Sequence, residues 1–293
     1  MILPPEIHEA LVERTGSAVR RVQPVSGGMV NQAARVETAA GFLFVKWRHH
    51  APAGFFTQEA DGLERLRASG AIRVPEVIVV STTPAFLALE YIDARRVRDP
   101  VAFARRFGES LAALHRGSLS PSGAFGLEYD NYLGALPQRN TPTLRWSDFY
   151  RNQRLLPQID QARRQGLLPT ARERLLEQVV AQSETLLYSG YPASPCLIHG
   201  DLWSGNFLAA NDEPILIDPA ISYSHREVEM AYTELFGGFP PGFLDAYNNA
   251  FPLDEGYSDR RPLHQLYPLL VHLNYFGEEY GLRVEETCRT CLR

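Results

Sequence analysis

Residues 199–206 read His-Gly-Asp-Leu-Trp-Ser-Gly-Asn, and Asp218 follows at the end of a later apolar run. Phosphoryl transfer needs a carboxylate that accepts the proton of the attacking hydroxyl, and oxygen ligands that hold Mg²⁺ against the phosphates. The spacing H-x-D-x-x-x-x-N places both kinds of group on one short loop. We therefore predict Asp201 as the catalytic base and Asn206 and Asp218 as the metal ligands.

The same residue types also occur in ordinary turns. His, Asp and Asn often cap a tight turn between two apolar runs, and this would explain any one of them alone. The combined spacing, together with an aspartate after the next predicted strand, favours the catalytic interpretation. Pro219 and Ala220 follow Asp218, so the segment lacks the D-F-G element of protein kinases.

Lys46 stands in the apolar run 42–47, where an ammonium group is costly unless a carboxylate meets it. Glu59, in the next predicted helix, is the expected partner, and Glu64 is an alternative. A strand lysine paired with a helical glutamate holds the α- and β-phosphates of ATP in kinase-like folds. A lysine at a strand end that points to water would show the same sequence pattern.

Two further segments are candidates for ATP binding. Residues 26–31 read Ser-Gly-Gly-Met-Val-Asn between two predicted strands, and adjacent glycines let backbone N–H groups approach phosphate oxygens. A plain hairpin turn is the alternative for this loop, whose predicted nucleotide contacts are Gly27, Gly28, Met29, Val30 and Asn31. By its position at the end of the strand-rich part, the segment Glu90, Tyr91 and Ile92 is predicted to be the adenine-binding hinge.

The secondary-structure pattern changes near residue 93. Before it, short β-branched and aromatic runs between Gly, Pro and Thr turns predict one helix at 57–69 and strands at 20–25, 32–37, 42–47, 77–81 and 85–92. After it, helical spacing dominates. A helix behind the expected cap Asp99–Pro100 should bury one face formed by Val101, Ala104, Phe107, Leu111 and Leu114.

Further helices are expected in the second half at about 147–165, 170–188, 225–236, 241–250 and 262–279, with a β-rich patch at 196–218. We predict an α+β, two-lobed fold. Residues 1–92 would form a small β-rich lobe that binds the nucleotide, and residues 93–293 a larger helical lobe for catalysis and substrate binding. A ligand cleft is expected between the two lobes.

Composition narrows the possible partners. The 293 residues are 45 % hydrophobic and 22 % charged, which is typical of a globular protein, and a net charge of −5 argues against nucleic acid. The first residues lack an export signal, and the apolar stretch 77–92 is interrupted too often to cross a membrane. We expect a cytoplasmic protein without a membrane partner. Cys288 and Cys291 are predicted to lie in an ordinary helical tail, because no second C-x-x-C pair completes a zinc site.

Taken together, these segments resemble the fructosamine-3-kinase, or ketosamine-3-kinase, family. The resemblance extends from about residue 20 to residue 280 and rests on the tracts 27–31, 45–47, 89–92, 199–206, 218–220, 225–227 and 235–239. Its most specific part is H-G-D-L-W-S-G-N followed by D-P-A. The family implies a protein-kinase-like fold, shared with aminoglycoside and choline phosphotransferases.

The resemblance also implies an activity. Members use ATP and Mg²⁺ to phosphorylate the 3-hydroxyl of ketosamines, which are sugars attached by glycation to small or protein-bound amines, and the ester then decomposes and frees the amine. Trp203 would be a platform for the sugar or its amine, and His225 a substrate contact. Two positions depart from the family: Met29 replaces a cysteine found in some members, and Tyr275 replaces a histidine found in many.

Two other functions remain open from the sequence. A phosphotransferase for another hydroxylated amine, such as an aminoglycoside or choline, would share the fold, although Trp203 and Ser204 favour a ketosamine because generic phosphate chemistry does not require them. A catalytically inactive nucleotide-binding module would usually lack the base, the metal ligands or the strand lysine, and all of these are present. A monomer or a homodimer would be compatible with the sequence.

Overall fold

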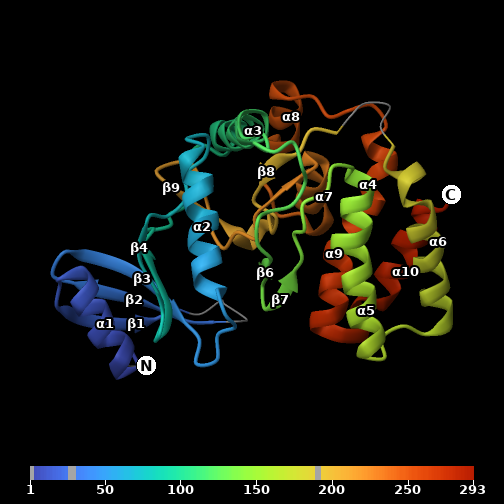
Figure 1. Ribbon diagram of the computed structural model, residues 1–293. Helices are drawn as coiled ribbons and strands as arrows, with labels where there is room; N and C mark the ends of the chain where they lie inside the picture. The colour runs from blue at the N-terminus through green and yellow to red at the C-terminus, as the bar shows by residue number, and fades with distance from the viewer. Residues whose placement is uncertain (1–2, 26–30, 189–192) are drawn as a thin grey trace.

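The computed structural model describes residues 3–25, 31–188 and 193–293 and has two lobes (Figure 1). The smaller lobe holds a five-stranded antiparallel sheet in the order β1-β2-β3-β5-β4. Its strands are β1 (Val19–Pro24), β2 (Gln32–Thr38), β3 (Gly41–Trp47), β4 (Val77–Thr82) and β5 (Ala85–Glu90). The five predicted strands and the two-lobed α+β class are therefore confirmed.

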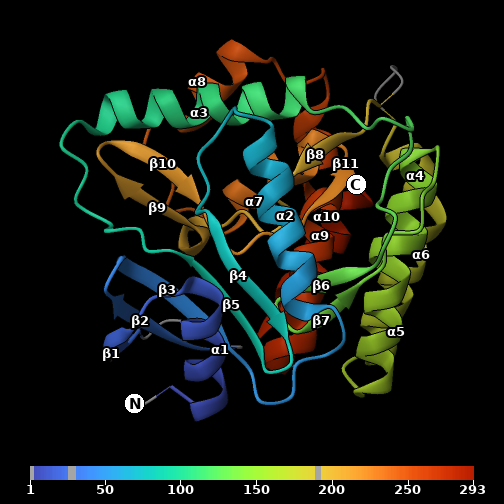
Figure 2. The same ribbon diagram turned by 60° about the vertical axis from the view of Figure 1, so that its left-hand side comes forward.

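Helices cover both faces of this sheet: α1 (Pro5–Thr15) on one and α2 (Phe55–Ala68) on the other (Figure 2). Successive side chains of a strand point to opposite faces. In β5, Phe86 and Ala88 accordingly pack in the cluster that contains α1, whereas Leu87 and Leu89 pack in the cluster that contains α2. The sequence predicted α2, but α1 was missed; it begins at Pro5, the second of two consecutive prolines.

The same alternation orients Lys46 in β3. Its neighbours Val45 and Trp47 are buried on the α1 side of the sheet. The Lys46 side chain must therefore leave β3 on the opposite side, toward α2 and the second lobe. The position of a single lysine in an apolar strand is thus fixed by the packing of its two neighbours.

The larger lobe is mainly helical (Figures 1 and 2). Its helices are α3 (Pro100–Gly117), α4 (Trp146–Phe149), a π-helical turn (Tyr150–Leu155), α5 (Leu156–Arg164), α6 (Thr170–Leu186), α7 (Arg226–Phe236), α8 (Phe243–Ala250), α9 (Tyr257–Phe276) and α10 (Gly281–Cys291), with 3₁₀ turns at Ser204–Asn206 and Gly277–Tyr280. The predicted helices are present. The assignment of residues 1–92 and 93–293 to separate domains stays a prediction.

Three two-stranded antiparallel pairs complete this lobe. They are β8 (Cys196–Ile198) with β11 (Ser222–Ser224), β9 (Phe207–Ala210) with β10 (Glu213–Leu216), and β6 (Asn131–Leu133) with β7 (Leu136–Gln138). The first two pairs flank the residues 199–206 and 218–220. The β-rich patch predicted at 196–218 is confirmed, whereas the three-residue strands β6, β7 and β11 were missed.

The structure confirms the predicted cap of α3 but corrects two other details of the predicted helices. Asp99 caps α3 as expected, and its carboxylate accepts the N–H groups of Val101 and Ala102. Val101, however, is 79 % exposed, because a residue in the first turn of α3 extends beyond the core that buries Phe107. Helix α9 begins at Tyr257 rather than near Pro262, because Gly256 adopts the left-handed conformation before the first turn.

Cys288 and Cys291 lie in α10, as predicted for a helical tail. Both side chains are buried thiols, and burial raises the pKa of each to about 12. A thiol with such a pKa is inert near neutral pH. In the part of the chain that the structure describes, no helix combines the length and the hydropathy required to cross a bilayer.

Candidate active site

The loop after β8 is fixed by its own backbone and by His199. Gly200 has φ +85°, and a Cβ at this position would clash with the carbonyl of Ala220, so only glycine fits. The His199 ring donates from Nε2 to the carbonyl of Ile217 at 2.8 Å and accepts the N–H of Asp201 at Nδ1. Burial lowers the pKa of His199, which keeps the ring neutral in this arrangement.

A buried carboxylate anchors the same loop from α7. Glu229 accepts the backbone N–H groups of His199 and Gly200 at 3.0 and 2.7 Å. It also contacts Nε2 of His115, whose Nδ1 lies 2.8 Å from the hydroxyl of Tyr247. Burial opposes the charge on Glu229, but these hydrogen bonds outweigh it and lower the pKa of Glu229. Glu229 thus holds the start of the loop, and none of the lysines and arginines that the structure describes pairs with it.

Asp201 projects from this loop between two hydrogen-bond donors. Its Oδ1 accepts the hydroxyl of Tyr232 at 2.9 Å, and its Oδ2 accepts the amide of Asn206 at 2.9 Å. Burial, which these donors only partly offset, raises the pKa of Asp201 to about 7. A carboxylate with a pKa near neutrality is well matched to accept and release a proton.

Asn206 and Asp218 could hold a metal ion. The amide nitrogen of Asn206 is used by Asp201, through both its carboxylate and its backbone carbonyl, and this leaves the amide oxygen for another ligand. Asp218 has φ +55°, an unusual conformation for a residue other than glycine, and its side chain is 50 % exposed. An amide oxygen and a carboxylate are oxygen ligands that Mg²⁺ accepts, so the donor set fits the ion.

Lys46 links the two lobes. Its Nζ contacts Oε1 of Glu59 on α2 and lies 2.7 Å from Oδ1 of Asp218. Burial opposes the charge on Lys46, but the two carboxylates outweigh it and raise its pKa, so the ammonium group stays charged. Glu59 is the partner, and the alternative, Glu64, is exposed on α2. The contact with Asp218 was not predicted.

The predicted hinge begins at Glu90, the last residue of β5, and continues through Tyr91 and Ile92. Ile92 packs against Ala210 and Ile215 of the β9–β10 hairpin, and its carbonyl accepts the N–H of Ala94. The side chain of Tyr91 points to Arg35, whose guanidinium lies 4.9 Å from the centre of the ring. Within the described residues, no backbone hydrogen bond uses the N–H of Ile92, which leaves this donor available to a ligand.

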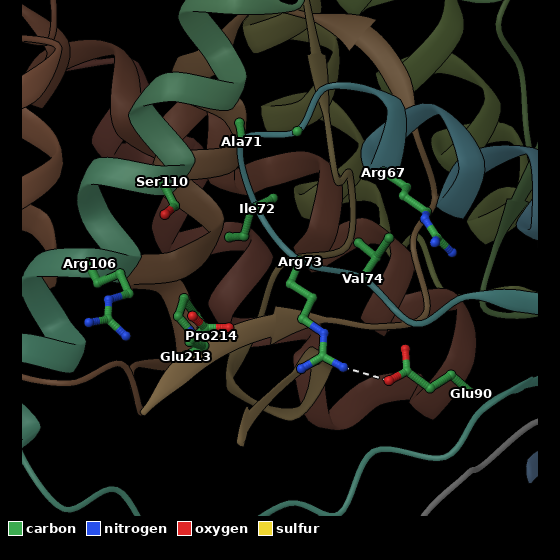
Figure 3. A pocket seen from close by; sticks show the side chains of 11 residues that line it. Arg67, Ala71, Ile72, Arg73, Val74, Glu90, Arg106, Ser110, Glu213 and Pro214 are labelled. Atoms are coloured by element: carbon green, nitrogen blue, oxygen red, sulfur yellow. Dashed lines mark hydrogen bonds and ion pairs between the residues drawn. The ribbon is translucent and has the colours of Figure 1, made fainter. Parts of the chain in front are cut away.

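Two cavities adjoin the hinge, with volumes of about 460 and 260 Å³. The larger lies between α2, α3 and β10, and the ion pair of Arg73 with Glu90, at 2.5 Å, forms one of its edges (Figure 3). The smaller shares both of these residues and continues to Arg95 and Asn211. Neither cavity is lined by Asp201 or Lys46, so both flank the predicted hinge rather than the predicted base.

Most of the predicted glycine-rich loop, Gly27, Gly28, Met29 and Val30, lies outside the described residues. Asn31 directly precedes β2 and is half-buried. Its contact with a nucleotide stays a prediction.

The two predicted substrate residues differ in environment. Trp203 is 38 % exposed, and its ring packs so closely on Gly205 that a Cβ there would clash. His225 is only 5 % exposed. Its Nδ1 accepts the N–H of Glu227 at the start of α7, and its ring stacks on that of His264. In the structure His225 is a buried cap of α7, and its predicted contact with the substrate stays a prediction.

The comparisons with known proteins agree with this geometry. The model of the family described as fructosamine kinase matches residues 4–293. This chain belongs to the fructosamine kinase family. A protein of Enterococcus faecium assigned as a ketoamine kinase is 40 % identical over 271 residues, which cover 91 % of this chain and 93 % of the relative. A chloroplastic protein-ribulosamine 3-kinase of Arabidopsis thaliana is 34 % identical over 92 % of this chain and 82 % of its own length.

Solved structures show that this family member shares its fold with proteins of other families. A crystal structure from Thermobifida fusca, assigned as a fructosamine-3-kinase, has a TM-score of 0.89 and 39 % identity, with 98 % of both chains covered. An aminoglycoside phosphotransferase bound to ADP has a TM-score of 0.67 and 17 % identity over 99 % of both chains. The predicted family, the kinase class and the kinase-like fold are therefore confirmed.

Sequence reasoning missed the residues of this family member that support the catalytic loop. Tyr232 and Glu229 contact it from α7, and His115 of α3 contacts Glu229. The signal for α7 was present: residues 226–231 place two glutamates, Glu227 and Glu229, beside apolar residues of a predicted helix, where a buried acidic side chain requires a partner.

Proposed function

We propose that this protein is an ATP- and Mg²⁺-dependent kinase that phosphorylates the 3-hydroxyl of ketosamines, the adducts that glycation forms between sugars and amines. The observation that carries the proposal is the position of Asp201, which is held by Asn206 and Tyr232 near the start of a loop with the sequence H-G-D-L-W-S-G-N. The membership of the chain in the fructosamine kinase family supports the choice of substrate.

The residues for the nucleotide come from both lobes. Lys46, fixed by Glu59, would hold the α- and β-phosphates, and the backbone of residues 90–92 would contact the adenine. Asn206 and Asp218 would hold Mg²⁺. When bound, ATP supplies the phosphoryl group, and the metal ion neutralises charge on the phosphates. The ion pair of Lys46 with Asp218 brings the phosphate-binding and metal-binding residues to one place.

Asp201 would act on the acceptor. Its carboxylate orients the sugar hydroxyl and takes its proton as the oxygen forms the new bond to phosphorus. Tyr232 and Asn206 hold both carboxylate oxygens, so the group is oriented before the substrate arrives. The exposed face of Trp203 would support the protonated amine or the sugar ring.

A substrate panel tests the proposal. The consumption of ATP is measured with a ribulosamine, a fructosamine, choline and an aminoglycoside, each with and without Mg²⁺. We expect turnover with the two ketosamines only, and only with Mg²⁺. Preference for choline or the aminoglycoside would instead support the related phosphotransferases, and binding of ATP without turnover of any compound would support an inactive nucleotide-binding module.

A variant of Trp203 tests the substrate side. We expect Trp203→Ala to raise the KM for the ketosamine more than the KM for ATP, because the exposed ring face is lost. The alternative role of Trp203 is to pack the catalytic loop onto Gly205. In that case the variant would lose thermal stability and kcat, while the KM for the ketosamine would stay constant.

The cellular setting belongs to the same proposal. We propose that the enzyme acts in the cytoplasm on ketosamines of small molecules or proteins, as a monomer or a homodimer, and without nucleic acid. The net charge of −5 supports the last point. Light scattering after size-exclusion chromatography determines the oligomeric state.

A further inference from the structure

Aromatic side chains lead from the proposed base into the helical lobe. Tyr232, which donates to Oδ1 of Asp201, is one helical turn before Phe236 on α7, and their ring centres lie 6.0 Å apart. The Phe236 ring lies 4.7 Å from the ring of His272 on α9. The proposed catalytic carboxylate is therefore the first member of a continuous series of contacts that continues through aromatic rings.

The series continues to the surface. The His272 ring lies 5.5 Å from Phe276 and 5.0 Å from Tyr280, and the last two are 5.7 Å apart. We call Phe236, His272, Phe276 and Tyr280 the aromatic strip. Tyr232 is buried, whereas Phe276 is 37 % exposed. Through Tyr232, the strip connects the interior beside Asp201 to a ring face that solvent can reach.

One member of the strip offers a polar atom. Nδ1 of His272 lies 2.7 Å from the carbonyl of Pro268, which can only accept, so Nδ1 carries a proton. Burial lowers the pKa of His272, so the ring is neutral at pH 7 and its Nε2 is an acceptor. A neutral ring does not repel a protonated amine. Arg283 lies over the Phe236 ring, 5.2 Å from its centre, which leaves Phe276 as the more accessible apolar face.

The chemistry of a ketosamine relates this surface to the reaction. The carbon that carries the 3-hydroxyl is separated from the amine nitrogen by only two carbon atoms. When that hydroxyl contacts Asp201, the substituent on the nitrogen must therefore leave the site along a nearby wall. A wall of aromatic rings stabilises an aromatic or long apolar group by burying its surface and by ring contacts.

We propose that the aromatic strip binds the substituent carried by the amine nitrogen of the ketosamine, and that it selects aromatic and long apolar substituents. The inference rests on the proposed function and adds to it the part of the substrate outside the sugar. It makes Phe276 a specificity residue, since the sugar hydroxyl and ATP would be bound elsewhere.

The test uses the full chain and fructosamines made from methylamine, butylamine and phenethylamine. We expect kcat/KM of the wild type to rise along this series, with about a tenfold difference between the first and the last. Phe276→Ala should remove most of that difference by raising the KM of the phenethylamine adduct. Tyr188→Ala, at a ring that is 75 % exposed after α6, is the matched control and should keep the wild-type series.

The possible outcomes distinguish the proposed role of the aromatic strip from the proposed kinase function. Equal kcat/KM for all three adducts in the wild type, or an equal loss for all three in Phe276→Ala, would overturn the inference while the kinase function stands. Turnover of none of the adducts would overturn both. Tyr280→Ala tests a second residue of the aromatic strip. If Phe276→Ala and Tyr280→Ala both keep the wild-type kcat/KM for all three adducts, the inference is overturned and the specificity belongs to another surface.

Discussion

Asp201 precedes β9 and Asp218 follows β10, so both lie at the open end of this antiparallel hairpin, yet their environments differ. Asp201 accepts hydrogen bonds from the neutral groups of Tyr232 and Asn206, and no ion pair reaches it from the described residues. Asp218 lies 2.7 Å from the ammonium group of Lys46. Burial raises the pKa of Asp201 to about 7, whereas Lys46 outweighs the effect of burial and lowers the pKa of Asp218.

This difference separates two roles within one residue type. A carboxylate that gains and loses its proton near pH 7 suits a general base. A carboxylate that stays ionised suits a metal ligand, because a metal ion binds the deprotonated form. The cation that decides between these roles comes from the other lobe, so the assignment depends on the packing of the two lobes.

The largest expected effect is the loss of the base. Asp201→Asn should bind ATP but lower kcat by about 10²- to 10⁴-fold, because an amide does not accept the hydroxyl proton. Steady-state kinetics with a ketosamine measure the loss. Asp245→Asn, the same change at an exposed position of α8, is the control and should keep wild-type kcat. A kcat close to wild type in Asp201→Asn would remove the assignment of the base.

The second test concerns Asp218. Asp218→Ala should weaken the binding of Mg²⁺ with ATP at least about tenfold, because hydrogen bonds and contacts to charged groups contribute roughly 1.5–3 kcal/mol each. Calorimetric titration with the non-hydrolysed nucleotide measures the affinity with and without Mg²⁺. We expect the Mg²⁺-dependent part of the affinity to fall. Unchanged affinity and activity would place the metal ion at other residues.

The third test moves the pKa of the base. The rate should fall as the pH decreases through about 7, because Asp201 then gains a proton, whereas Asp218 stays ionised. Tyr232→Phe removes a donor that stabilises the charged carboxylate, so the acidic limb should move to higher pH by about one unit. The pH dependence of kcat for both proteins measures the shift. An acidic limb at the same pH in both would show that another group controls it.

The smallest effect is on stability. The pKa of Asp201 is about 7 in the fold and roughly 3.9 in an unfolded chain. Its contribution to the free energy of unfolding is therefore fully present below about pH 4 and is lost as the pH rises through about 7. The amide introduced by Asp201→Asn does not titrate, so this variant should gain stability relative to wild type over this range, by about 2–4 °C in Tm. Thermal melts at pH 5 and pH 8 measure the gain, and an equal difference at both values would contradict the raised pKa.

Sequence patterns predicted the local parts of the site. The alternation of β3 and the spacing of residues 199–206 depend only on neighbouring residues, and both appear in the structure as expected. Contacts between segments that are distant along the chain were harder to predict from sequence patterns. Glu59 and Glu64 both stand on α2, and only the helix rotation against the sheet shows that Glu59 faces Lys46. His225 belongs to a family tract but lies in the core.

By itself, the sequence determined the lobes, the strand that carries Lys46 and the catalytic loop, because hydrophobic periodicity and motif spacing are properties of short segments. Only the tertiary structure decided the charge that each of the two carboxylates, Asp201 and Asp218, carries near neutral pH. Burial, the hydroxyl of Tyr232 and the ammonium group of Lys46 set the pKa of each aspartate. Electrostatic interactions act through space, so groups distant along the chain decide the charge of a residue whose identity the sequence already specifies.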